Sequence, residues 1–426
     1  MRCGRAAGAV ALLTALAAVP IARAAETFDV SAFEKKAFEW NGFVELRPER
    51  QWLRRDSTGY QLQYPGETRS SVDRRSAAAE VSGVLRHGSL SFNFTGHASG
   101  LDEPRGADSD GRMYEAYASW QVTPRGIAEL GKRALRWGKG YAWSPVAFLE
   151  RPKDPSDPEL AREGFVMATG ALVRSFEGPL QTLSLMSALV PTTSGLNADF
   201  GRPGHLNPAF KLYGLVFDSD IDLTYAARGS DGPRFGFDFS RNLGSNLEVH
   251  GEWARTADAS RALLTPGNGL AMHTRSYTSS LLGLRYLTQH DTTIVFELYR
   301  NGGGYSTSEM AQFFDVVRAS ASVSALAPVA GRAAAQGYTR PNAMRRYAYL
   351  RVSQKEPFNI VDLTPSVTLI SNTDDHSYLV MPEAVYTGFD NLELRLRLAL
   401  NRGGDSTEYG ERPARSRVEL RVRYFF

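Results

Sequence analysis

The chain has 426 residues, with 49 basic and 46 acidic side chains, a formal net charge of +3 and a single cysteine, Cys3. A basic start, an apolar run over 6–21 and the sequence Ala22-Arg23-Ala24 are typical of a secretory signal, so residues 1–24 are expected to be removed. The remaining 402 residues hold 46 basic and 46 acidic side chains and no cysteine. This excludes a basic nucleic-acid binder, a cysteine-ligated zinc or iron–sulfur site and a disulfide-stapled module.

Hydrophobic residues make up 42% of the chain and aromatic residues 11%. After the signal there is no uncharged apolar run of about 18 residues, so a polytopic helical membrane domain is not expected. The aromatic content suits the interfacial girdles of a membrane β-barrel. Composition alone leaves a soluble fold and a barrel as alternatives.

Residues 25–39 are expected to form a short periplasmic segment, either a cap at the base of the barrel or a lead-in to the first strand. From residue 40 onward, apolar and polar residues alternate with a period of two, as at Leu90, Phe92 and Phe94. Such alternation predicts strands with one apolar and one polar face. We predict strands at 40–54, 72–86, 88–99, 112–123, 126–138, 163–176, 179–190, 209–217, 219–228, 232–242, 245–256, 276–288, 290–301, 343–354, 357–370, 376–388, 390–401 and 415–426.

The connections between these strands alternate between short and mostly long. The expected long connections are 55–71, 100–111, 139–162, 191–208, 257–275, 302–342 and 402–414, while 229–231 and 371–375 are short on the same side. Bacterial outer-membrane barrels have short periplasmic turns, longer extracellular loops and an even number of strands. The sequence therefore predicts an all-β fold over 40–426, a transmembrane antiparallel β-barrel of about 18 strands, with 16 as the alternative.

The chain ends on Phe426, after an apolar residue at every second position. This end resembles the C-terminal strand by which the barrel-assembly machinery recognises outer-membrane proteins of Gram-negative bacteria. The expected partners are therefore that machinery, through Phe426, together with outer-membrane lipid and lipopolysaccharide. A spanning sheet must close on itself, so the last strand is expected to pair with the first, with Glu45 and Arg47 facing inward. The oligomeric state does not follow from the sequence.

Charged residues of both signs occupy the positions predicted to face the lumen, and 42 of the 49 basic residues are arginine. These side chains are expected either to form cross-strand Arg–Glu ladders that stiffen the wall or to line a path for an anion or sugar. The candidate pore-lining residues are Arg133, Arg136, Glu248, Glu252, Arg285, Glu297, Arg351, Glu393, Arg395, Arg397, Arg417, Glu419, Arg421 and Arg423.

Segment 302–342 is the longest expected loop. Met310, Phe313, Phe314 and Val317 are spaced for one face of a helix. An apolar helical face in a loop must pack against something, so we expect this segment to fold into the lumen as a constriction or plug. The alternatives are a position over the mouth and a surface contact.

The stretch Gly131-Lys132-Arg133-Ala134-Leu135-Arg136-Trp137-Gly138-Lys139-Gly140 resembles a segment of porin-like barrels, including alginate-export-type channels. It departs from that pattern at Lys139, where the family has an aspartate, and at Arg133 or Ala134, where it has a glutamine. The resemblance implies an 18-stranded barrel that carries an anionic polysaccharide through a pore lined by basic residues. Nearby, Trp137, Tyr141 and Trp143 are candidates for a saccharide or anion platform, with a rigid solvated or in-folded loop as the alternative.

Residues for catalysis or cofactor binding are not apparent. The seven histidines occur without a recognisable nucleophile motif, and the spacing of Glu248, His250 and Glu252 is better explained by lumenal charge than by a metal site. We therefore expect no enzyme activity, cofactor or bound metal. The expected function is passive diffusion of small hydrophilic or anionic solutes, including an anionic saccharide, across the outer membrane. The alternatives are an export conduit for an anionic exopolysaccharide and a barrel-borne hydrolase or adhesin.

Overall fold

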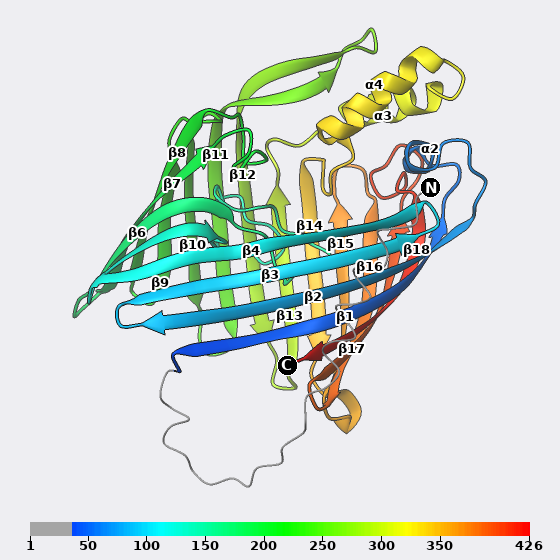
Figure 1. The fold of residues 1–426 in the computed structure, drawn as a ribbon. Coiled ribbons are helices and arrows are strands. Elements are labelled where there is room, and N and C mark those ends of the chain that lie inside the picture. Colours follow the sequence, from blue (N-terminus) through cyan, green and yellow to red (C-terminus); the bar gives the residue numbers. More distant parts are fainter. Residues whose placement is uncertain (1–35) are drawn as a thin grey trace, which may run out of the picture.

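The computed structural model describes residues 36–426 and shows a closed barrel of 18 antiparallel strands (Figure 1). Each strand pairs with its neighbours in the sequence, and β1 also pairs with β18, so the sheet has no free edge. The expected signal at 1–24 and most of the segment 25–39 lie outside the described residues. The strands are β1 (Phe38–Leu53), β2 (Ser71–His87), β3 (Leu90–Glu103), β4 (Gly106–Thr123), β5 (Gly126–Arg133), β6 (Phe165–Ser175), β7 (Leu180–Thr192), β8 (His205–Val216), β9 (Ser219–Ala226), β10 (Arg234–Asn242), β11 (Leu247–Leu264), β12 (Leu270–Leu287), β13 (Thr292–Arg300), β14 (Arg346–Gln354), β15 (Leu363–Asn372), β16 (Tyr378–Phe389), β17 (Leu392–Arg402) and β18 (Ala414–Phe425).

Closure of the barrel joins the two ends of the chain's described part in register. Val44 lies opposite Tyr424 and Leu46 opposite Val422. The amide of Phe426 donates to the carbonyl oxygen of Gly42, and the carbonyl oxygen of Phe426 accepts from the amide of Gly42, both at 3.0 Å. Because every strand then has two partners, the backbone hydrogen bonds are satisfied without water, as a lipid environment requires.

The distribution of side chains is inside-out relative to a water-soluble protein. Leu130, Leu172 and Leu46 point outward and are 66%, 62% and 56% exposed, whereas Glu297 and Arg421, which point inward, are 0% and 2% exposed. An apolar belt around a charged interior is the pattern of a barrel embedded in lipid. Within residues 36–426, no helix is long and apolar enough to cross a membrane.

The predicted strand count and closure are confirmed, but two expected long loops are wrong. The segments 100–111 and 257–275 are mostly strand, since β3 and β4 continue to a turn at 104–105 and β11 and β12 continue to a turn at 265–269. The extension of β3 and β4 is mostly polar, and the extension of β11 and β12 has consecutive apolar residues at 262–264 and 270–272, so period-two alternation is lost in both although the strands remain paired. The predicted fifth strand is also too long, because β5 ends at Arg133.

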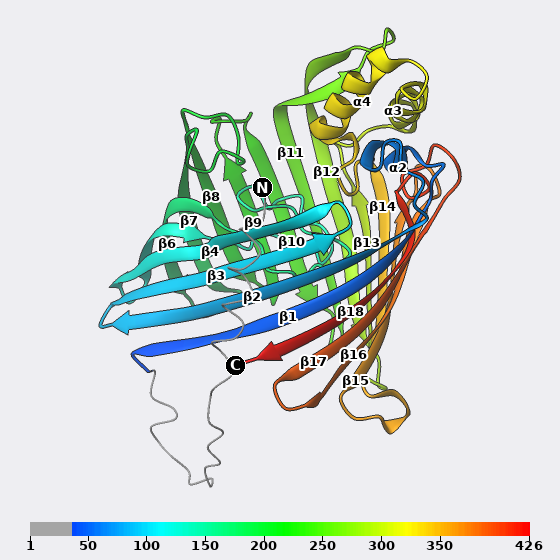
Figure 2. The same ribbon diagram turned by 45° about the vertical axis from the view of Figure 1, so that its right-hand side comes forward.

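The two ends of the barrel differ. In Figures 1 and 2 the short turns and the C-terminus lie at the lower end, whereas α2 (Thr58–Gln63), α3 (Thr307–Ala319) and α4 (Ala327–Ala333) lie at the upper end. The remaining helical turns are η2 (Ser324–Leu326), η3 (Ala334–Tyr338) and η4 (Pro357–Asn359). This polarity matches the predicted arrangement of short turns and long loops.

The predicted helix in segment 302–342 is confirmed as α3. Ser306 and Glu309 form a capping box at its start, and its apolar face is buried in a cluster that includes Leu264 and Tyr338. The helix contacts β11 and α2, and Arg318 pairs with Glu411 in the β17–β18 connection. The segment therefore bridges loops at the upper end of the barrel, and its role as a constriction stays a prediction.

Candidate functional site

Residues 134–164, between β5 and β6, form a segment that contacts opposite walls of the lumen, and we call it the crossing segment. Glu252 of β11 holds its first part by accepting hydrogen bonds from the backbone amides of Lys139 at 2.7 Å, Gly140 at 2.6 Å and Val146 at 3.2 Å. One wall side chain thus fixes a bend of the crossing segment.

The bend requires glycine at two positions of the sequence stretch 131–140. Gly138 has a φ of +86°, which favours glycine, and a Cβ there would lie 2.6 Å from Oε1 of Glu252. A Cβ on Gly140 would lie 2.0 Å from the carbonyl oxygen of Trp143. Both residues allow the backbone to wrap closely around the carboxylate.

Glu297 of β13 is the second anchor. It accepts from the backbone amides of Tyr141 and of Ala142, the latter at 2.9 Å, and lies 3.0 Å from Nε2 of His250. Glu252 and Glu297 face the lumen as predicted, but the crossing segment covers them and leaves them 3% and 0% exposed. They hold the segment in place and do not border the open space.

An ion pair of Lys139 holds the same part of the crossing segment against β9. Its Nζ lies 3.0 Å from Asp222, which Lys211 also approaches to 3.1 Å. Burial alone would lower the pKa of Lys139, but the carboxylate of Asp222 outweighs it and the pKa is raised. Asp238 of β10 is the cross-strand neighbour of Asp222 of β9, and both are fully buried.

The aromatic residues expected to form a platform are packed rather than open. Trp143 stacks on Tyr299 at a centroid distance of 5.0 Å and contacts Tyr347 and Tyr349. Trp137 and Trp143 are only 3% and 7% exposed. Trp143 is packed against the wall and borders none of the three cavities described below, whereas Trp137 lines the largest of them, so a platform role stays a prediction. Tyr141 remains partly exposed and lines the larger cavity.

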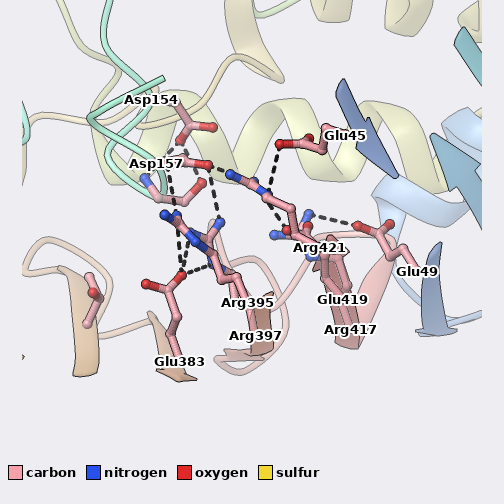
Figure 3. A network of polar contacts seen from close by, with 12 residues as sticks. Glu45, Glu49, Asp154, Asp157, Glu383, Arg395, Arg397, Arg417, Glu419 and Arg421 are labelled. Atoms are coloured by element: carbon pink, nitrogen blue, oxygen red, sulfur yellow. Dashed lines mark hydrogen bonds and ion pairs between the residues drawn. The ribbon is translucent and has the colours of Figure 1, made fainter. Parts of the chain in front are cut away.

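The tip of the crossing segment reaches the opposite wall through Asp157. Its carboxylate lies 2.9 Å from Nη2 of Arg421, 3.5 Å from Nη1 of Arg397 and 3.9 Å from Nη1 of Arg395 (Figure 3). Burial alone would raise the pKa of Asp157, but Arg397 and Arg421 outweigh it and hold the pKa below 3.8. Asp157 was not among the predicted site residues, since nothing in the sequence marks which acid of a long loop meets arginines far along the chain.

The arginines of β17 and β18 are also paired with carboxylates on the wall. Glu383 accepts from Nε of Arg397 at 2.6 Å and from its Nη2 at 2.5 Å. The other ion pairs join Glu383 to Arg351 at 3.4 Å, Glu393 to Arg395 at 3.2 Å, Glu419 to Arg421 at 3.2 Å, Glu49 to Arg417 at 3.5 Å and Glu45 to Arg423 at 2.6 Å. Cross-strand ladders of arginine and carboxylate, one of the two predicted alternatives, are thus present.

Three adjoining cavities occupy the space that the crossing segment leaves. The largest, of about 700 Å³, is lined by that segment, by β2–β4 and by β11–β13, and it is bordered by Glu248 and Arg285. The second, of about 570 Å³, follows the arginines of β17 and β18. Both are lined by residues 159–161. The third, of about 320 Å³, shares Arg74 and Arg417 with the second.

The predicted pore-lining residues fall into three groups. Those that border a cavity are Arg136, Glu248, Arg285, Glu393, Arg395, Arg417, Glu419, Arg421 and Arg423. Arg351 and Arg397 belong to the ion-pair ladder without bordering these cavities, and Glu252 and Glu297 are the anchors described above. Arg133 pairs with Glu129 on its own strand.

Three arginines that border the two larger cavities differ from the rest. Within residues 36–426, no ion pair joins Arg47, Arg136 or Arg285 to a carboxylate, although Glu248 is the cross-strand neighbour of Arg285. Their guanidinium groups are therefore available to interact with an ion or solute in the cavities. Their pairing state could not be predicted, because it depends on the path of the crossing segment.

Glu248, His250 and Glu252, which were considered for a metal site, do not converge on one point. His250 lies between Glu297 and Glu248, 3.7 Å from the latter, while Glu252 is turned to the backbone of the crossing segment. Among the residues that the structure describes, no group of three or more histidine, cysteine, aspartate or glutamate side chains is placed to hold a metal ion.

Comparisons with known proteins give likeness in structure alone. No family model and no curated protein sequence matches the chain. The structure resembles OccAB1 of Acinetobacter baumannii with a TM-score of 0.52 and 11% identity, over 91% of this chain and 96% of that one. A triple mutant of the Rhodopseudomonas blastica porin aligns over 91% of this chain and 100% of its own, with 9% identity and a TM-score of 0.44, which is too low to argue from. The first likeness supports the β-barrel fold and, at this identity, nothing beyond the fold.

Proposed function

We propose that this protein is an outer-membrane channel for the passive diffusion of small hydrophilic solutes, with a preference for anions. The observation that carries the proposal is the series of three adjoining cavities inside a closed barrel whose outer surface is apolar. The crossing segment divides the lumen into spaces of a few hundred cubic ångströms. That size suits small molecules and excludes folded proteins.

The proposed preference for anions rests on arginines that no carboxylate pairs with, although in the described part of the chain the carboxylates of Glu80, Glu115, Glu159 and Glu248, which no arginine or lysine pairs with, border the largest cavity as well. Most lumenal arginines are balanced by a carboxylate, so they contribute little net field. Arg47, Arg136 and Arg285 are the exceptions, and they border the two larger cavities. A local set of uncompensated cations can select anions even where the chain as a whole is close to neutral.

We do not extend the proposal to export of an exopolysaccharide. The crossing segment is fastened to β11, β13 and β18, so a polymer chain would have to displace it. The stretch 131–140, on which the resemblance to alginate-export-type channels rests, has glycines whose structural role is to wrap Glu252. Those glycines therefore support a bent loop without indicating a saccharide.

Single-channel recording in planar bilayers tests the proposal. The purified full-length barrel is expected to give discrete conductance steps, and under a salt gradient the reversal potential should favour chloride over potassium. Absence of any steps from protein shown to be folded by heat-modifiable mobility on SDS gels would contradict the channel function. Steps with a preference for potassium would contradict the anion preference alone.

A further inference from the structure

The crossing segment is attached in two different ways. Its first part is fixed by Glu252 and Glu297, which accept backbone hydrogen bonds and are almost completely buried. Its tip depends on one side chain, because Asp157 is the only acid of residues 134–164 that pairs with arginines of β17 and β18 in the described part of the chain. The Asp157 side chain also retains 12% exposure, so it borders open space.

The arginines that hold Asp157 have other partners. Arg397 is hydrogen-bonded to Glu383 at 2.6 Å, and Arg421 lies 3.2 Å from Glu419 and 3.7 Å from Glu45. Departure of Asp157 would therefore leave neither guanidinium without a counter-charge. The contact can open without the full cost of stranding a buried charge.

The chemistry of the contact defines what can replace it. Arg397 and Arg421 together present nitrogen donors to one carboxylate that enters from the lumen (Figure 3). A solute with a carboxylate group would make the same charge-assisted hydrogen bonds. The cavity of about 570 Å³ is bordered by both Asp157 and Arg421, so such a solute can approach from the open side.

We propose that Asp157 is an intramolecular competitor that occupies a carboxylate-binding position at Arg397 and Arg421, and that a solute carboxylate displaces it and releases the tip of the crossing segment. This inference rests on the proposed channel function. A tethered group competes at an effective concentration in the millimolar range or above, so a free carboxylate has to reach a comparable concentration before it binds.

Asp157→Asn and Asp154→Asn form a matched pair for the test. Both remove one negative charge from the same tip. Asp154 is exposed, and among the residues that the structure describes its side chain accepts hydrogen bonds only from Ser156, which an asparagine oxygen can also accept. Single-channel conductance is measured over a concentration series of potassium acetate. The half-saturating acetate concentration is expected to fall roughly tenfold in Asp157→Asn and to stay unchanged in Asp154→Asn. Asp157→Glu, which returns a carboxylate, should restore at least part of the unsubstituted value.

Each alternative outcome has a distinct meaning. Equal shifts in the two asparagine variants would overturn the proposal, since they would reflect the charge of the lumen as a whole. No shift in Asp157→Asn, in protein whose folding is verified by heat-modifiable mobility, would overturn it as well. Absence of conductance in the unsubstituted barrel would instead count against the channel function itself.

Discussion

At the scale of single residues, the lumen separates arginines that stabilise the wall from arginines that act on its contents. Arg423 illustrates the first kind, since it donates to Glu45 at 2.6 Å and lies over the ring of Phe43. Arg136 and Arg285 illustrate the second, because both are exposed to the largest cavity. An arginine held by a carboxylate has little field left for a passing ion.

Neutralising Arg136 and Arg285 together should therefore weaken the preference for anions. We expect the double variant Arg136→Gln, Arg285→Gln to lower the anion-to-cation permeability ratio by about twofold or more, because a local ring of charge sets selectivity. The measurement is the reversal potential under a salt gradient. The control is the double variant Arg50→Gln, Arg75→Gln, whose arginines are exposed and pair with Asp73 and Asp102 on the outer face. Equal effects of the two double variants would refute a role for local charge.

The titration of Asp157 gives a second prediction at this scale. Its pKa in the folded protein is lowered below 3.8, so its contact with Arg395, Arg397 and Arg421 contributes stability that is present above pH 3.8 and is lost as the pH falls through the lowered value. Glu45, Glu383 and Glu419 face the same arginines and keep them paired. Channel conductance should stay constant from pH 7 to about 4 and rise below that, as the tip is released.

Asp157→Asn isolates the contribution of that one group to the pH profile. The variant keeps every other titratable side chain, so the difference between its profile and that of the unsubstituted barrel belongs to Asp157. We expect its conductance to be already high at pH 7 and to change little on acidification. A rise of the same size in both proteins would assign the pH response to another group.

At the scale of elements, the strands were predictable and the path of the connections was not. Alternation such as Leu392, Leu394 and Leu396 reports directly that one face meets lipid and the other the lumen. The path of the crossing segment depends on contacts such as Glu252 with Lys139, which are 113 residues apart in the sequence. No periodicity marks such a pair. Segment 302–342 was predicted to be a constriction because its apolar residues have helical spacing. Residues 134–164 form no helix, so no periodic pattern marked them.

The two segments can be distinguished by shortening each in turn. Replacing 153–160 by a short Gly-Ser linker removes Asp157 and two of the residues that line both larger cavities, Glu159 and Leu160, so we expect single-channel conductance to rise by about twofold or more. Deleting 305–335 removes α3 and α4 at the upper end of the barrel and should change conductance less. A larger rise after the second deletion would show that 302–342 is the narrower passage.

At the scale of the whole molecule, closure of the barrel by β1 and β18 continues the charged lumenal face and the apolar outer face around the full circumference. β1 and β18 are the first and last strands, yet their residues form one wall, with Glu45 pairing Arg423 and Glu49 pairing Arg417 across the seam. On the outer side of the same seam, the rings of Trp40 and Phe426 lie 5.6 Å apart. The seam therefore combines a charged lumenal face with an apolar outer face, as the other strand pairs do.

The seam makes Phe426 important for forming the barrel. Its backbone is hydrogen-bonded to Gly42 in both directions, and its side chain is the apolar end of the last strand. Phe426→Ala keeps those backbone bonds but removes the ring, which should cost about 1–3 kcal/mol of stability at the seam. We expect a smaller heat-modifiable fraction on SDS gels when the purified chain is refolded into detergent or lipid.

Phe358→Ala is the matched control for this variant. The ring of Phe358 is 92% exposed and lies in the turn between β14 and β15, at the end of the barrel opposite the long loops. If both variants fold to the same extent as the unsubstituted chain in lipid, but Phe426→Ala alone is poorly assembled in cells, the residue acts through recognition by the assembly machinery and not through the stability of the closed sheet.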